Sequence, residues 1–273
     1  YESPVLTVLI QGVRLAVDVP GQMIYELESP DESGRRAFRV KESIGVVFKD
    51  GQAPHSMTML MEQDGQIREF HRTKTAEGAT LPTLAELDQL RGTAKRGEAL
   101  ARFGVLGMEW AINMKQSGVS GAAKHWLAGT DRARTDIDFG IFGSIEMAVD
   151  GDTASQRASF EPFKQLSGRL LRQAQQSHPG FFLGDWHDFY ENITVVRRTT
   201  LEDQPAILLL LENDGAPSVE CYVDSNTGDV LQFDTVAIQP GMGEFPVSVL
   251  LADYREVRGL RIPHVMTTKT VEA

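Results

Sequence analysis

The sequence predicts a mainly β protein of the α+β class, in which a small β barrel or sandwich precedes a curved antiparallel half-barrel with helices in its concavity. Short runs that alternate apolar and polar residues recur along the 273 residues, and turns rich in Gly, Pro and Asp separate them. Two stretches with helical periodicity interrupt these runs. A helix, a meander, an inserted helix and a longer meander together predict one large curved sheet that encloses helices.

Composition excludes several classes of partner. The chain is 41% hydrophobic and 24% charged, which is ordinary for a soluble globular protein with room for two modest domains. The formal net charge of -11 argues against nucleic acid binding, which relies on clustered Lys and Arg. The longest apolar run, AILLLL at 206–211, is too short to cross a bilayer, so no transmembrane segment is predicted.

The first predicted domain, residues 1–76, is all β. Alternating runs such as AFRVKESIGVVFKD and HSMTMLMEQDG are followed by turn dipeptides, Asp50-Gly51 and Asp64-Gly65. Strands at this spacing are typical of a small barrel or sandwich. One side of a single run carries three methionines, which predict an apolar lining in preference to soft metal ligation: Met57, Met59 and Met61.

The second predicted domain covers residues 77–273. A linker is predicted over residues 74–82, and a helix follows it. Thr83 followed by Glu86 is a capping-box pattern. The apolar residues that follow at helical spacing predict one buried face: Leu84, Leu87, Leu90 and Ala94.

Strands resume near residue 103, and a second helix is predicted over residues 161–176. Its predicted buried side consists of Phe163, Leu166, Leu170 and Ala174. His178-Pro179-Gly180 ends this helix, and after an aromatic-rich segment four further strands run from ITVVRRTT to DVLQFDTVAI.

A hairpin is predicted to close the chain. Arg258-Gly259 is its turn, because Gly accepts the positive φ that tight hairpins need. Asp253 and Arg255 are expected on the solvent side and Tyr254 on the inner side. This arrangement fixes the strand register, since a slip by one residue would bury both charges.

The familiar catalytic signatures are missing from the sequence. It contains no Gly-x-Ser-x-Gly elbow, no His-Glu-x-x-His pair and no phosphate loop, and its six His residues include no i, i+4 pair. Cys221 is the only cysteine, lies in an alternating run and is predicted to be a buried, inert thiol. The stretch from Asp224 resembles half of a calcium loop, but its twelfth position is Thr235, so a polar turn is favoured. We expect no catalytic residues, no metal and no cofactor within the chain.

The closing strands contain a Tyr-x-Asp-x-x-Thr-Gly turn and an Asp-Tyr-Arg-Glu-Val-x-Gly-x-x-x-Pro hairpin. With these motifs the chain resembles the LolA/LolB-like group of bacterial outer-membrane lipoprotein-sorting-like proteins, and the resemblance covers about residues 83–271. Arg258 stands where this pattern usually has Asp or Asn. The matching residues are Tyr222, Asp224, Thr227, Gly228, Asp253, Tyr254, Arg255, Glu256, Val257, Gly259 and Pro263.

A second set of residues stands near the beginning of the chain: Val17, Pro20, Gly21, Leu27, Phe38, Val47 and Phe48. With these residues this part is similar to the small β domain that follows serine beta-lactamase-like hydrolases and other secreted peptidases. The chain starts at YESPVLTVLI without a Met or a basic leader, which predicts a piece of something longer. The two resemblances together imply an extracytoplasmic location, periplasmic or secreted.

The LolA-like resemblance implies a hydrophobic cavity and non-enzymatic binding of a lipid, an acylated peptide or another hydrophobic molecule. One alternative is that the chain forms the C-terminal accessory domains of a secreted serine hydrolase or peptidase, whose catalytic domain lies upstream. Another is a small-molecule enzyme that uses Asp or His residues in the cavity. The predicted ligand-contacting residues are Phe139, Phe142, Met147, Phe160, Phe163, Leu166, Phe181, Phe182 and Trp186.

Overall fold

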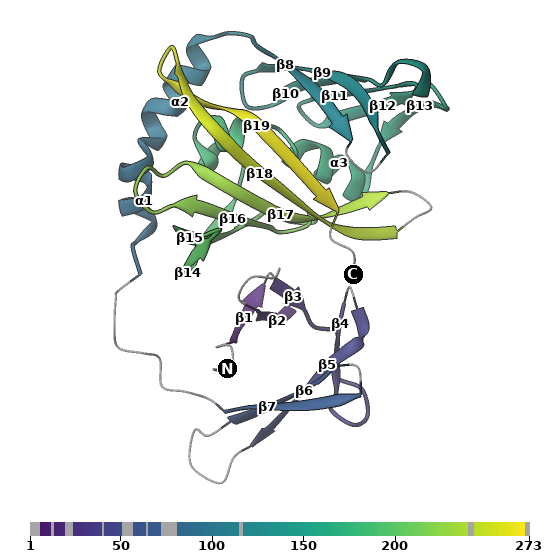
Figure 1. The fold of residues 1–273 in the computed structure, drawn as a ribbon, viewed down its shortest axis with the longest axis vertical. Helices are drawn as coiled ribbons and strands as arrows, with labels where there is room; N and C mark the ends of the chain where they lie inside the picture. The colour runs from purple at the N-terminus through teal and green to yellow at the C-terminus, as the bar shows by residue number, and fades with distance from the viewer. Residues whose placement is uncertain are drawn as a thin grey trace.

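A computed structural model of the chain describes residues 6–11, 14–19, 24–39, 41–50, 57–63, 65–71, 81–114, 117–239 and 243–270. These residues form four antiparallel sheets with a few short helices (Figure 1). The mainly β, α+β class that the sequence predicts is confirmed.

Two small sheets form the first part of the chain. One has three strands, β1 (Thr7–Gln11), β2 (Arg14–Asp18) and β3 (Ile24–Glu26). The other has four strands, β4 (Arg36–Phe38), β5 (Lys41–Asp50), β6 (Met57–Gln63) and β7 (Gln66–His71). An isolated bridge between Leu27 and Phe38 connects them, and they share an apolar core that includes Met59 and Met61. The likeness of this part to a hydrolase tail stays a prediction.

The two larger sheets have six strands each, in sequential order. The first contains β8 (Leu106–Met114), β9 (Val119–Ala128), β10 (Arg132–Asp138), β11 (Ser144–Asp150), β12 (Thr153–Ala158) and β13 (Glu161–Leu166). The second contains β14 (Asn192–Leu201), β15 (Gln204–Glu212), β16 (Val219–Asp224), β17 (Val230–Gln239), β18 (Gly243–Val257) and β19 (Leu260–Thr270). A short 3-10 turn, η1 (Gly140–Phe142), connects β10 to β11.

The sequence predicts one large sheet, and in this detail the structure differs. Strands β13 and β14 are not paired, because residues 167–191 between them fold into helices α3 (Gly168–Gln176) and α4 (Gly180–Leu183) and the 3-10 turn η2 (Trp186–Asp188). Helix α3 contacts both β12 and β17 and therefore lies between the two sheets. Helices enclosed by curved antiparallel sheet are thus present, with the sheet divided in two.

The helix predicted over residues 161–176 is wrong in its first third. Residues 161–166 form strand β13, which pairs with β12, and the helix begins only at Gly168. The helical spacing of apolar residues predicts a helix here, but these residues pair with β12 as a strand at the edge of the sheet. This pairing leaves Phe163 56% exposed. The predicted end is confirmed, since α3 stops at Gln176, before His178-Pro179-Gly180.

The predicted first helix is divided at Gly92. Helix α1 (Leu84–Arg91) starts with the predicted capping box, in which the Glu86 amide donates to the Thr83 hydroxyl and Glu86 accepts from the Thr83 amide. Gly92 then adopts a φ of 66°, which ends α1 in a left-handed residue, and α2 (Thr93–Arg102) follows. Leu87 is buried, whereas Leu90 is 41% exposed and Ala94 is exposed, so the predicted apolar face is only partly correct.

The closing hairpin is confirmed. Arg258 and Gly259 connect β18 to β19 with φ values of 51° and 87°, the positive pair that a two-residue hairpin turn requires. Asp253 and Arg255 are exposed and paired with each other, while Tyr254 packs against the main apolar core. The predicted turn at Asp224 is also present, because its carboxylate accepts hydrogen bonds from the amides of Asn226 and Thr227.

The first part of the chain packs on the outside of the β14–β19 sheet. Ala16 and Ile24 form a small apolar cluster with Leu208 and Tyr222. Asp18 forms an ion pair with Arg197, and the Ile24 amide donates to Glu220 at 2.6 Å. The domain boundary predicted between residues 76 and 77, and most of the predicted linker, lie outside the described residues.

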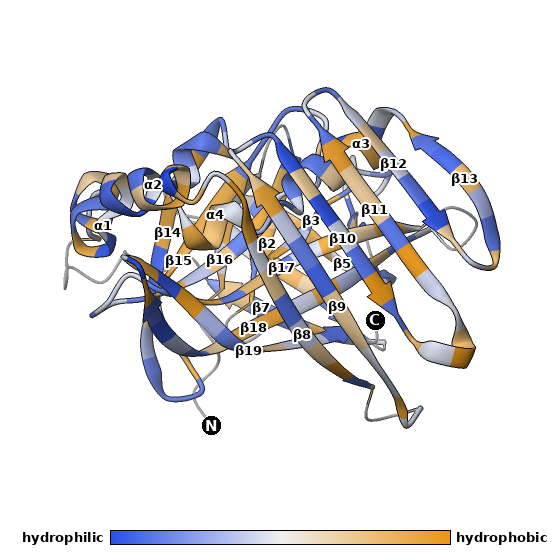
Figure 2. Cartoon of the chain, turned by 90° about the horizontal axis from the view of Figure 1, so that it is seen from above, coloured by the Kyte–Doolittle hydropathy of each residue, from blue (hydrophilic) through white to orange (hydrophobic). Residues whose placement is uncertain are grey.

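The main core lies between the two six-stranded sheets. Leu106 and Leu127 contribute to it from one sheet, and the alternate residues Ile207, Leu209 and Leu211 contribute from the other. Figure 2 shows β8–β13 side by side, with hydrophobic and hydrophilic residues alternating along the strands. Because alternate residues point to opposite faces, one face of this sheet is directed at the core.

Candidate functional site

Three of the predicted ligand-contacting residues fill the space between the sheets. Phe181, Phe182 and Trp186 are at most 2% exposed and belong to the main core. Phe181 makes edge-on contacts with Phe182, Tyr190 and Phe233, at ring-centroid distances between 5.1 and 5.6 Å. In this structure the three aromatic residues therefore pack against protein side chains.

A buried arginine holds this aromatic segment in place. Arg91 donates hydrogen bonds to the carbonyls of Phe182 (2.8 Å), Phe181 (3.3 Å) and Gly184 (3.4 Å), and its guanidinium lies 4.8 Å from the Trp186 ring centroid. The Trp186 indole also donates to Asp88 at 2.8 Å. Burial, with a contribution from Arg96, lowers the pKa of Arg91 to about 10.

Four predicted residues lie at the far ends of β10 to β13. Phe142, Phe160 and Phe163 are 62%, 69% and 56% exposed, and Phe139 is half-buried. The η1 turn and the β12–β13 turn are adjacent, because the Ser159 amide and hydroxyl bond to the Ser144 backbone. These four side chains are therefore much more exposed to solvent than Phe181, Phe182 and Trp186.

The last two predicted residues lie on the face of β8–β13 that is directed at the core, which we call the inner face. Leu166 is buried against α3 in a cluster with Val149, Ala154 and Ala174, and Met147 packs on its margin. The nine predicted residues are therefore distributed over three places, and whether any of them contacts a ligand stays a prediction.

The apolar inner face extends beyond both packed clusters. Direct cross-strand pairing places five residues in one row across β8 to β12: Trp110, Ala123, Ile137, Ile145 and Ala158. We call this set the Ile137 row. Trp110, Ile137 and Ile145 are only half-buried, and none of the three belongs to a core cluster. Sequence analysis missed them, because alternation within a strand indicates which face a residue occupies but not which residues of neighbouring strands lie beside it.

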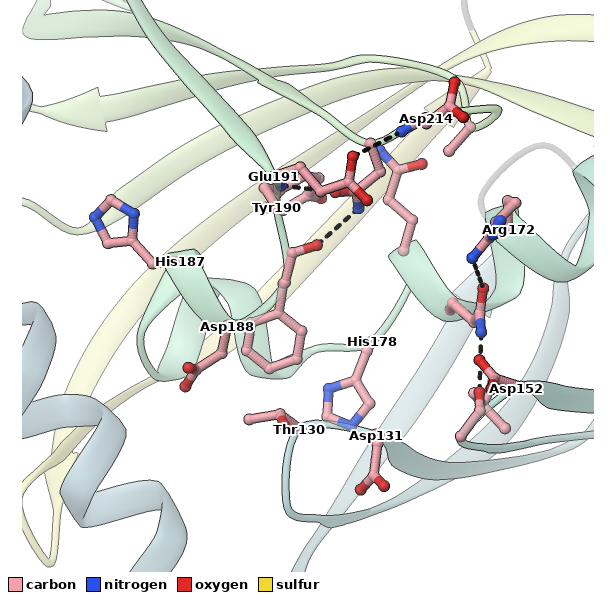
Figure 3. Close-up of a pocket in the computed structure, with 17 residues that line it drawn as sticks. Thr130, Asp131, Asp152, Arg172, His178, His187, Asp188, Tyr190, Glu191 and Asp214 are labelled. Carbon is pink, nitrogen blue, oxygen red and sulfur yellow. Dashed lines mark hydrogen bonds between the residues drawn. The ribbon is translucent and has the colours of Figure 1, made fainter.

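A polar pocket of about 390 Å³ opens at another place, between α3, η2 and three turns (Figure 3). Its titratable lining residues are mostly acidic: Asp131, Asp152, Arg172, His178, His187, Asp188, Glu191 and Asp214. The polarity of this lining does not suit an acyl chain.

The two histidines of this pocket differ in how their ring nitrogens are engaged, because both nitrogens of His178 are bonded whereas one nitrogen of His187, Nε2, is paired with a carboxylate. The His178 Nδ1 accepts from the Gly180 amide at 3.0 Å and its Nε2 donates to the Arg132 carbonyl at 3.0 Å. Burial lowers the pKa of His178, so the ring is held neutral. His187 pairs with Asp88 at 2.9 Å. In the part of the chain that the structure describes, no hydroxyl or thiol lies within hydrogen-bond distance of either ring.

Cys221 is buried in the main core, as predicted, and burial raises the pKa of its thiol to about 12. Among the described residues, no group of three or more His, Cys, Asp or Glu side chains is placed to hold a metal ion. The described helices include none with the length and apolar character needed to span a membrane.

Comparison with known proteins shows a distant likeness to solved structures but not to known sequences. No protein-family model and no curated protein sequence matches the chain. A crystal structure of a LolA superfamily protein from Nitrosomonas europaea is similar to it, with 10% sequence identity and a TM-score of 0.45 over 71% of this chain and 87% of that chain.

Proposed function

We propose that the chain binds a lipid, an acylated peptide or another hydrophobic molecule without catalysis, on the inner face of β8–β13. The Ile137 row is the observation that supports this proposal. Its three large side chains continue the apolar face of the core, yet no packed cluster includes them.

A hydrophobic ligand laid on this row would complete the burial of these side chains. Each Å² of apolar surface removed from water contributes about 25 cal/mol, so even ~200 Å² gives a useful share of the binding free energy. The buried aromatic residues Phe181, Phe182 and Trp186 would stay packed in the main core next to the bound ligand and would not enclose it. In line with the sequence resemblance, we place this activity outside the cytoplasm.

Uptake of a fluorescent fatty acid tests the proposal, together with native mass spectrometry of the gently purified protein. We expect saturable uptake, and an Ile145→Asn variant should bind the probe at least about tenfold more weakly, since it places a polar amide under the chain. Glu146→Gln is the matched control, because Glu146 is the next residue and points to the opposite face. Absence of uptake, or equal binding by both variants, contradicts the proposal.

A further inference from the structure

A polar pair interrupts the apolar inner face beside the Ile137 row. His125 on β9 and Thr135 on β10 are direct cross-strand partners, and the His125 Nδ1 lies 2.9 Å from the Thr135 hydroxyl. Both side chains are half-buried. On one side the pair borders Leu127 and Ala133 of the core, and on the other side it borders Ala123 and Ile137.

This pair retains one unused hydrogen-bond donor whichever tautomer it adopts. If the Thr135 hydroxyl donates to Nδ1, the imidazole proton is on Nε2; if Nδ1 donates to the hydroxyl oxygen, the hydroxyl proton is left over. Nε2 makes no hydrogen bond to a described residue and is not among the fully buried atoms that lack one. Water can therefore meet this donor in the free protein, whereas an apolar ligand laid over the pair would displace that water and leave the donor unpaired unless the ligand itself supplies an acceptor.

The surroundings define what that acceptor can be. The charged side chains of the same strands alternate with His125 and Thr135 and so point to the other face: Lys124, Arg132, Arg134, Asp136 and Asp138. Burial lowers the pKa of His125, which keeps the imidazole neutral. The cation in the same cross-strand row, Lys164 of β13, is three strands away from Thr135 and is already paired with Glu161 at 2.7 Å, so the site favours a neutral acceptor over an anionic head group.

We propose that His125 and Thr135 donate a hydrogen bond to the carbonyl of an ester or amide in an acylated ligand whose hydrocarbon chain lies on the Ile137 row. The proposal rests on the function proposed above and assigns it a ligand class. Hydrocarbon without a carbonyl would use the apolar row but leave the donor unpaired.

Displacement of the bound fluorescent fatty acid by methyl laurate and by tetradecane, a hydrocarbon of matched chain length without an acceptor, tests the assignment. The double variant His125→Phe/Thr135→Val removes every donor of the pair and should bind methyl laurate about tenfold more weakly than the wild-type protein does, the effect of one lost hydrogen bond that water does not replace beneath the ligand. Its affinity for tetradecane should not fall.

Two further variants separate a ligand contact from a structural role. His125→Gln retains a donor and should keep part of the affinity for methyl laurate, while Thr153→Val, at an exposed position of β12, should bind it as the wild-type protein does. If the double variant binds methyl laurate as tightly as the wild-type protein, the assignment is overturned but hydrophobic binding stands. If the wild-type protein binds neither the probe nor the two compounds, the proposed function itself fails.

Discussion

The Tyr254 hydroxyl donates a 2.6 Å hydrogen bond to the main-chain carbonyl of Val230, on the strand next to its own. The paired register of β17 and β18 ends at Gln232 and Leu250, so this side chain extends the connection between the strands beyond their ladder. Asp253, the preceding residue, has a φ of 55° and makes no backbone pair with β19. Tyr254 thus fixes the hairpin where its backbone pairing is interrupted.

Tyr254→Ala should therefore lower the free energy of unfolding by about 3 kcal/mol or more, because it removes an aromatic ring that packs against the main core together with its hydrogen bond. Tyr254→Phe retains the ring and should cost about 1 kcal/mol for the lost hydrogen bond. Urea denaturation of the variants measures both values. Asp253→Asn, which removes an exposed ion pair with Arg255, should cost less than about 1 kcal/mol. The reverse ranking would show that the charges hold the hairpin.

Arg91→Met should destabilise the protein by about 3 kcal/mol, because it leaves buried carbonyls of residues 181, 182 and 184 without a donor. Methionine preserves much of the apolar stem, so most of the loss reports the hydrogen bonds. Lys95→Met on the exposed side of α2 is the control and should change stability by less than about 0.5 kcal/mol. If the two variants unfold at the same urea concentration, Arg91 does not hold the aromatic segment in place.

Glu220→Gln should make the free energy of unfolding depend less on pH. Burial, and then the negative charge of Asp234, raise the pKa of Glu220 well above its usual range. Because the folded state favours the protonated acid, its stability falls as the pH rises above the unfolded-state pKa of about 4.3. The Gln variant mimics the protonated form, so its advantage over the wild-type protein should grow between pH 5 and pH 7.

Urea denaturation of both proteins at several pH values measures this difference. The amide retains an acceptor for the Ile24 amide, so the contact between β3 and the β14–β19 sheet can persist. Glu256→Gln, at an exposed position of β18, is the control, and its stability should change with pH as that of the wild-type protein does. A Gln variant that is less stable than the wild-type protein at pH 7 would contradict the prediction.

Short sequence motifs correctly predicted the helix caps and turns that depend on a few neighbouring residues. The capping box at Thr83, the turn at Arg258-Gly259 and the end of α3 depend on a few neighbouring residues, and all are confirmed. Residues 161–166 were misassigned, because a helical spacing of apolar residues cannot reveal an available partner strand. The division of the large sheet depends on how residues 167–191 fold between the sheets, which also lies beyond local patterns.

The candidate site was predicted less well, for a related reason. Aromatic content pointed to Phe181 and Trp186, but composition does not distinguish a packed core from a cavity wall. The Ile137 row and the His125–Thr135 pair appear only when the register across five strands is known. Residue type suggests what chemistry is present, whereas pairing determines which side chains meet.

The sequence-predicted aromatic residues should divide into two classes when truncated. Phe181→Ala removes a side chain that is 2% exposed and packed against three other rings, so we expect a loss of about 3–5 kcal/mol in the free energy of unfolding. Phe142→Ala removes one that is 62% exposed and should cost less than about 0.5 kcal/mol. Probe binding by Phe142→Ala then reports contact with the ligand without a stability effect. If Phe181→Ala were tolerated and also weakened fatty acid uptake, Phe181 would line the ligand site, and the aromatic segment would have to move when the ligand binds.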